Sequence, residues 1–155
     1  MAAQFATEAG DEPMNNALWR YALQVYSRPG VESLLLRLQD EFDADILQIL
    51  AVLWANETAL RISEEALNAP DYVAWRETMI LPLRDRRRAC QRGEHGDLYE
   101  LLKKAELEAE RYGLGLLWTV LKDSPAASEN CGIQGLMLIC NSEKECRELL
   151  QLAQP

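Results

Sequence analysis

The sequence predicts an all-α fold, a compact single-domain irregular helical bundle of about seven or eight helices. Apolar residues recur at intervals of three and four along most of the chain, which is the spacing of one helix face. Short polar residues, proline and glycine separate these segments at positions typical of helix ends. No stretch offers a partner strand for a sheet. With 155 residues, 48% of them hydrophobic, the chain is long enough to bury a core without metal or disulfide support.

Clear apolar stripes predict the first two helices. Asn15 or Asn16 is expected to cap a helix that ends near Tyr26, because a short amide side chain accepts a hydrogen bond from the N–H groups of the first turn. A Pro-Gly turn follows, and the second helix is predicted from Val31 to about Phe42.

A third helix, from Ala44 to Ala55 with Asp43 as its N-cap, is predicted to lie at the centre of the fold. Its residues are apolar nearly all round, and such a helix must be packed on most sides. Gln48 is interpreted as a core amide with satisfied hydrogen bonds rather than as a pocket residue.

Arginine is concentrated in a later predicted helix. A short helix is expected from Ser63, and Pro70 begins the arginine-rich one, with Asp71 as its cap. Pro82 lies inside this helix. Because proline lacks an N–H and crowds the preceding turn, we expect a kink there.

The C-terminal half is predicted to contain a long helix from Asp97 and shorter ones after it. The apolar face of the long helix is expected to consist of Leu98, Leu101, Leu102, Ala105, Ala109, Tyr112, Leu116 and Val120, with glycines weakening its end. Residues 131–140 suit a buried helix or a strand, and we favour the helix. A capping box of Ser142 and Glu145 is expected to start the last helix. Residues 1–14 are predicted to be a flexible lead and residues 15–155 a single helical domain.

The net charge of −9 makes a nucleic acid partner unlikely, because neutralising phosphates supplies most of the affinity of such binders. The acidic balance suits a basic protein partner. No signal peptide is expected, and no apolar run reaches the ~20 residues that cross a bilayer. The four cysteines form no CxxC pair and are interpreted as reduced thiols. We therefore expect a cytoplasmic protein without membrane contact, metal or cofactor.

Arg76 is the first candidate site residue, because the helical spacing places it among apolar neighbours. A buried guanidinium needs a carboxylate partner, and Asp40, Asp43 and Asp45 are the obvious suppliers. The favoured interpretation is a buried ion pair that locks helices together. The alternative is a polar pocket for an anionic or polar ligand, built from Asp40, Asp45, Arg76 and Arg84.

A second candidate is the run of arginines that ends this helix. The run is too dense for one helix face, so some of its side chains must be solvated. Solvated charges beside a helix C-terminus are the plainer interpretation; the functional one is a contact with an acidic protein segment or a phosphate group. The run consists of Arg84, Arg86, Arg87, Arg88 and Arg92.

Other chemistries receive little support. Asp40 and Asp43 have the spacing of a magnesium–diphosphate motif, but a helix break is expected between them and a second aspartate cluster is missing. His95, the single histidine, lies in a glycine-flanked loop, so no catalytic residue is assigned. The four tryptophans are interpreted as core residues.

Six short elements resemble a family of short helical proteins of proteobacteria, including pseudomonads, whose function is unknown. They lie between Asn15 and Arg88, and the tail from Asp123 departs from the family pattern. An asparagine usual after the third element is replaced by Asp45 or displaced. The elements are Leu18-Trp19, Pro29-Gly30, Leu38-Gln39-Asp40, Trp54-Ala55, Trp75-Arg76 and Pro82-Leu83-Arg84. The resemblance implies a small cytosolic helical protein and no particular activity.

The sequence hypothesis is therefore a non-enzymatic cytosolic adaptor or regulatory protein that contacts a partner protein through the basic patch. The alternative is a small-molecule binder or enzyme that uses the polar Asp/Arg pocket between helices.

Overall fold

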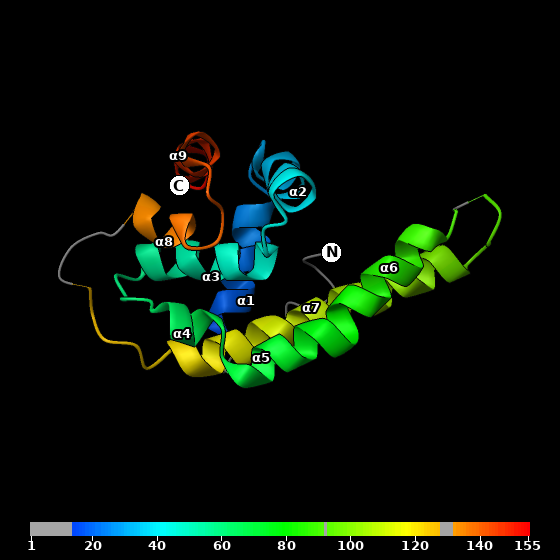
Figure 1. The fold of residues 1–155 in the computed structure, drawn as a ribbon, viewed down its shortest axis with the longest axis horizontal. Helices are drawn as coiled ribbons and strands as arrows, with labels where there is room; N and C mark the ends of the chain where they lie inside the picture. The colour runs from blue at the N-terminus through cyan, green and yellow to red at the C-terminus, as the bar shows by residue number, and fades with distance from the viewer. Residues whose placement is uncertain (1–13, 92, 128–131) are drawn as a thin grey trace.

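A long two-helix hairpin carries a cluster of shorter helices on one half of its length (Figure 1). The computed structural model describes residues 14–91, 93–127 and 132–155. The predicted all-α class is confirmed, and within these residues β pairing is limited to an isolated bridge between Leu60 and Ala126. The helices are α1 (Ala17–Tyr26), α2 (Val31–Phe42), α3 (Ile46–Glu57), α4 (Glu64–Leu67), α5 (Pro70–Trp75), α6 (Leu81–Ala89), α7 (Leu98–Leu121), α8 (Ile133–Met137) and α9 (Glu143–Leu152).

The hairpin consists of α7 and a second continuous helix formed by α5, a π-helical turn and α6 (Figure 1). The π-helical turn, η2 (Arg76–Ile80), ends where the N–H of Leu81 donates to the carbonyl of Arg76, five residues earlier. Pro82, which has no N–H to donate, follows directly. We predicted a kink at this proline; the structure has a π-helical turn just before it.

Helix α3 lies at the centre, as predicted. It packs against α1, α2, α7 and α8, and eight of its residues are buried: Leu47, Ile49, Leu50, Ala51, Val52, Leu53, Trp54 and Ala55. The predicted cap was wrong. Asp43 has a left-handed backbone (φ 52°) at the end of α2. Asp45 caps α3 instead, because its side chain accepts from the N–H groups of the first turn.

Of the other predicted helix caps, some are confirmed and some were wrong. Asn16 caps α1 and Ser63 caps α4, both through their side-chain oxygens. Asp71 is not a cap; it lies in the first turn of α5, and Ala69 precedes that helix. The capping box of the last helix is incomplete, because Ser142 donates to the carboxylate of Glu145 and accepts from no N–H of the helix.

The predicted apolar face of α7 was correct at Ala109, which is buried, and at Leu116, which packs against the core, but wrong at four other positions. Leu98, Leu101, Tyr112 and Val120 are exposed, and the buried residues of α7 are Glu106, Ala109, Gly113, Leu114, Gly115, Leu117, Trp118 and Leu121. The first turns of α7 belong to the half of the hairpin that projects beyond the other helices (Figure 1). Packing against the helix cluster, not the apolar residues of those first turns, sets the buried face.

Gly113 lets α7 approach the core closely. A Cβ atom at this position would lie 3.1 Å from Ile80 Cδ1 and 3.2 Å from Leu47 Cδ1. The helix nevertheless continues to Leu121, so the glycine serves packing and does not end the helix.

Gln48 has satisfied hydrogen bonds, as predicted, but it is only partly buried and is not a core residue. Gln48 donates to the carbonyl of Leu67 and to the side chain of Asn68, which ties α3 to α4. Within residues 132–140, the part of the uncertain segment that the structure describes, α8 is a helix, as predicted.

Candidate functional site

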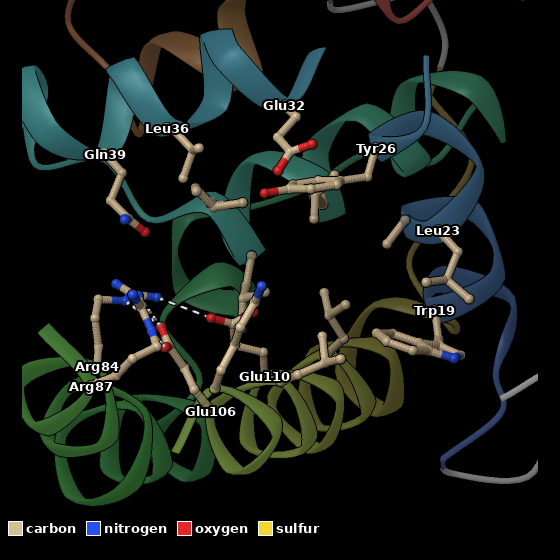
Figure 2. A pocket seen from close by; sticks show the side chains of 17 residues that line it. Trp19, Leu23, Tyr26, Glu32, Leu36, Gln39, Arg84, Arg87, Glu106 and Glu110 are labelled. Atoms are coloured by element: carbon tan, nitrogen blue, oxygen red, sulfur yellow. Dashed lines mark hydrogen bonds and ion pairs between the residues drawn. The ribbon is translucent and has the colours of Figure 1, made fainter. Parts of the chain in front are cut away.

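A pocket of about 340 Å³ lies between the hairpin and the helix cluster. Figure 2 shows α2 above it, α1 on the right, and α6 and α7 below. Side chains from α3 complete the wall. The volume is in the range of small-molecule sites.

One end of the pocket is apolar. Trp19 and Leu23 of α1 lie on the right in Figure 2, and Leu107 and Leu114 of α7 and Leu50 of α3 also line the pocket. Trp19 is buried, with 3% of its surface exposed. Such a wall favours the hydrocarbon part of a ligand, because burying apolar surface is favourable by about 25 cal/mol per Å².

The other end is a cluster of two arginines and two glutamates, which we call the Arg–Glu cluster. Arg84 and Arg87 come from α6, and Glu106 and Glu110 from α7 (Figure 2). Arg84 Nε lies 3.0 Å from Glu106 Oε1, and Arg84 Nη2 lies 3.3 Å from Glu110 Oε1. Arg87 holds Glu106 through two contacts, from Nε to Oε2 and from Nη2 to Oε1.

The two glutamates of the cluster have opposite pKa shifts. Burial alone would raise the pKa of Glu106, but the hydrogen bonds and charges of Arg87 and Arg84 outweigh it and lower that pKa. Burial and the neighbouring charge of Glu106 raise the pKa of Glu110 to about 7, and Arg84 offsets only part of this. Glu110 therefore exchanges a proton near neutral pH while Glu106 stays ionised.

Polar groups from α1 and α2 face the cluster across the pocket. Figure 2 shows Tyr26, Glu32 and Gln39 on that side. Burial and the negative charge of Glu32 raise the pKa of Tyr26 to about 12, so its hydroxyl stays protonated and is a hydrogen-bond donor at neutral pH.

The structure separates the residues that the sequence grouped into one polar pocket. Arg76 and Asp45 form the predicted ion pair, with 2.9 Å between Arg76 Nε and Asp45 Oδ2. This pair joins the hairpin to the start of α3 and does not line the pocket. Asp40 pairs with Arg88 at 3.2 Å, and both side chains are largely exposed. Of Asp40, Asp45, Arg76, Arg84 and Arg88, only Arg84 lines the pocket.

The predicted basic patch is also divided. Arg84 and Arg87 turn into the pocket, whereas Arg86 and Arg88 are exposed. Arg92 lies outside the described residues.

Sequence reasoning missed Glu106 and Glu110 as the partners of Arg84. A signal for them exists in α7: counting back from Leu121 through Leu117 and Leu114 in steps of four and three reaches Glu110 and then Glu106. An acid on the buried stripe of one helix, facing an arginine-rich helix, indicates a buried ion pair.

Within the part of the chain that the structure describes, no group of three or more histidine, cysteine, aspartate and glutamate side chains is arranged to hold a metal ion. No helix within it has the length and apolar character needed to cross a membrane.

Fold and site together define an all-helical protein with an amphipathic pocket between its helices. The chain belongs to the family described as "Protein of unknown function (DUF2390)", which its residues 17–117 match. This range includes α1 to α6, most of α7 and all the pocket residues. Comparison with curated proteins and with solved structures gave no match.

Proposed function

We propose that this protein binds a small amphipathic molecule in the pocket between α1, α2, α3, α6 and α7. The observation that carries the proposal is the division of one cavity into an apolar end and a charged end. The apolar body of the ligand packs against Trp19, Leu23 and Leu107, and its polar group reaches the Arg–Glu cluster. Of the two sequence hypotheses, this geometry supports the small-molecule binder, with glutamates in place of the expected aspartates.

The role proposed for the pocket is binding. Each guanidinium of the Arg–Glu cluster is already held by a carboxylate of α7. Groups fixed in this way form a preorganised polar surface, which lowers the cost of ordering side chains around a ligand.

Binding of the neutral apolar dye Nile red, followed by its fluorescence, tests the proposal. We expect saturable binding to one site. Leu107→Trp adds a large side chain to the apolar wall and should weaken dye binding at least about tenfold. Leu101→Trp is the matched control, because Leu101 lies on the same helix, is 61% exposed and does not line the pocket. Equal dye binding by both folded variants would place the site elsewhere and contradict the proposal.

A second candidate function is the contact with a partner protein. The end of the hairpin, where α6 ends and α7 begins, projects from the helix cluster (Figure 1). It carries Arg86 and Arg88 together with the exposed side chains of Leu98 and Leu101. Such a combination suits an acidic, partly apolar segment of another protein.

Charge reversal tests this second function. Arg86→Glu with Arg88→Glu should remove a partner that the unaltered protein captures from a cell extract and that binds again after purification. Lys122→Glu with Lys144→Glu, an equal charge change outside the hairpin end, should retain it. Loss of the partner with both pairs of substitutions would indicate a general charge effect and contradict this contact.

A cytoplasmic location is part of the same proposal. Its support is the chemistry of the cysteines: Cys140 and Cys146 are both buried as free thiols, which is usual in a reducing compartment.

A further inference from the structure

The two glutamates of the Arg–Glu cluster share Arg84 unequally. Glu106 is held by Arg84 and by two contacts from Arg87. Glu110 has one contact, 3.3 Å from a terminal nitrogen of Arg84, and 26% of its side chain is exposed. Glu110 is therefore the carboxylate of the cluster that another anion displaces most easily.

The pocket wall contains a third basic side chain, that of Lys103. Lys103 of α7 lines the pocket, one helical turn before Glu106. No carboxylate among the described residues forms an ion pair with it. A lysine of the pocket wall without a carboxylate partner is suited to bind a ligand anion.

The charges that face Glu110 come from all sides of the pocket. Arg84 and Arg87 belong to α6, and Lys103 and Glu106 to α7. Across the pocket lie the Tyr26 hydroxyl of α1 and the Glu32 carboxylate of α2 (Figure 2). When Glu110 is neutral, basic side chains in the pocket wall outnumber acidic ones by one. The wall then has a single positive charge to be balanced.

Resting on the ligand-binding function proposed above, we propose that the ligand is a monocarboxylate with an apolar body, whose carboxylate binds Arg84 and Lys103 in place of the carboxylate of Glu110. As the anion binds, Glu110 takes up one proton from solvent. The one bond that forms is the O–H bond of Glu110. The proton balances the charge of the bound anion, so the occupied wall has the same net charge as the empty wall with ionised Glu110.

The exchange is favourable because the carboxyl group of the ligand is more acidic than that of Glu110. Burial and Glu106 raise the pKa of Glu110 to about 7, so protonating it near neutral pH costs little. An ordinary carboxylic acid titrates near pH ~4 and stays ionised at that pH. A cationic ligand would instead place its charge beside two guanidinium groups, which is repulsive in a pocket of low dielectric.

Calorimetric titration with three eight-carbon probes tests the inference. Octanoate, octylammonium and octan-1-ol share an apolar chain and differ in charge. At pH 6 we expect octanoate to bind at least about tenfold more tightly than the other two, and its affinity to fall several-fold by pH 8. Titrations in two buffers of different ionisation enthalpy should show proton uptake on octanoate binding at pH 8.

Two variants test whether Glu110 causes the pH dependence and whether Lys103 binds the carboxylate of octanoate. Glu110→Gln keeps a neutral group of the same shape, so its octanoate affinity should be high and equal at pH 6 and pH 8. Lys103→Gln should weaken octanoate binding and leave octan-1-ol binding unchanged. Glu108→Gln, an exposed position on the same helix outside the pocket, is the control and should keep the pH dependence of the unaltered protein.

The outcomes separate this inference from the proposed function. Octylammonium or octan-1-ol binding as tightly as octanoate would overturn the inference, while weaker binding of that probe to Leu107→Trp would still support a ligand pocket. Unchanged pH dependence in Glu110→Gln would overturn the exchange at Arg84. If none of the probes binds although Nile red does, the carboxylate assignment is wrong; if Nile red also fails, the proposed function fails with it.

Discussion

The hydroxyl of Tyr72 donates a hydrogen bond to Asp45 Oδ2 at 2.6 Å, and Arg76 Nε lies 2.9 Å from the same oxygen. The other carboxylate oxygen of Asp45 accepts from the N–H of Leu47 at 3.0 Å. One carboxylate thus caps the central helix α3 and ties it to the hairpin. Burial and the charge of Asp45 raise the pKa of Tyr72 well above its usual value, so this hydroxyl remains a donor.

Asp45→Ala should destabilise the protein by about 3 kcal/mol, because it removes a helix cap and leaves the buried Tyr72 hydroxyl without its acceptor. Tyr72→Phe should cost about 1 kcal/mol, and the two effects should be non-additive in a double-mutant cycle. Urea denaturation measures both. Asp40→Ala is the control, because its ion pair with Arg88 is largely exposed and worth little. A cost for Asp45→Ala no larger than for Asp40→Ala would contradict the assigned role.

Arg76→Leu separates the ion pair from the other contacts of Asp45. The Arg76 side chain is 27% exposed, so water replaces part of what Asp45 loses. We expect a cost of about 1 kcal/mol, well below that of stranding a fully buried charge. Urea denaturation beside Asp45→Ala gives the comparison, and an equal or larger cost for Arg76→Leu would show that the guanidinium dominates this contact.

Much of the fold could be predicted from the sequence, and the reason is visible in particular helices. The apolar residues of α2 and α3 are spaced so regularly that both ends of α2 were predicted closely and α3 was placed at the centre. The Arg76–Asp45 pair followed from one rule, that an arginine on an apolar stripe requires a nearby acid.

The pocket could not be predicted in the same way. Arg84 and Glu106 are 22 residues apart and meet only because the hairpin folds back. The buried face of α7 depends on which helices cover it, and the exposed Leu98 and Leu101 at its start indicated a different face. Local spacing does not contain that tertiary information.

The stability of the protein should depend on the protonation of Glu110. The pKa of this carboxyl is about 7 in the folded state, above its ordinary value of 4.5. The folded protein therefore holds a proton that the unfolded chain releases, and this contribution is lost as the pH rises from 4.5 through about 7. Relative to the unaltered protein, Glu110→Gln should become steadily more stable from pH 5 to pH 8 in urea denaturation. Glu108→Gln should show a constant difference over that range; the same constant difference in Glu110→Gln would contradict the assigned pKa.

The arginines of α6 should fall into two classes of stability effect. Arg87→Gln breaks both contacts to the buried Glu106 and should cost about 2–3 kcal/mol, because it leaves a carboxylate partly unpaired. Arg86→Gln, at an exposed position of the same helix, should change stability by less than about 0.5 kcal/mol. Thermal unfolding of the two variants side by side provides the measurement, and equal effects would mean that Arg87 is not engaged with Glu106 in solution.

Gly135 of α8 should resist replacement by alanine although it lies inside a helix. A Cβ atom there would lie 2.8 Å from Val52 Cγ1, closer than real contacts allow, and Val52 is fixed in the buried centre of α3. Overpacking of this kind costs about 1–3 kcal/mol and outweighs the gain of about 1 kcal/mol in helix propensity.

A second substitution isolates that clash. Val52→Ala alone should destabilise the protein by leaving a small cavity, but combined with Gly135→Ala it makes room for the new methyl group. The double variant should therefore be more stable in urea denaturation than the sum of the two single effects allows. Gly93→Ala, where a Cβ atom meets nothing within 4 Å, is the neutral control. Strict additivity of the two substitutions would show that α8 moves away from α3 in solution and that the close approach at Gly135 is not what fixes these two helices together.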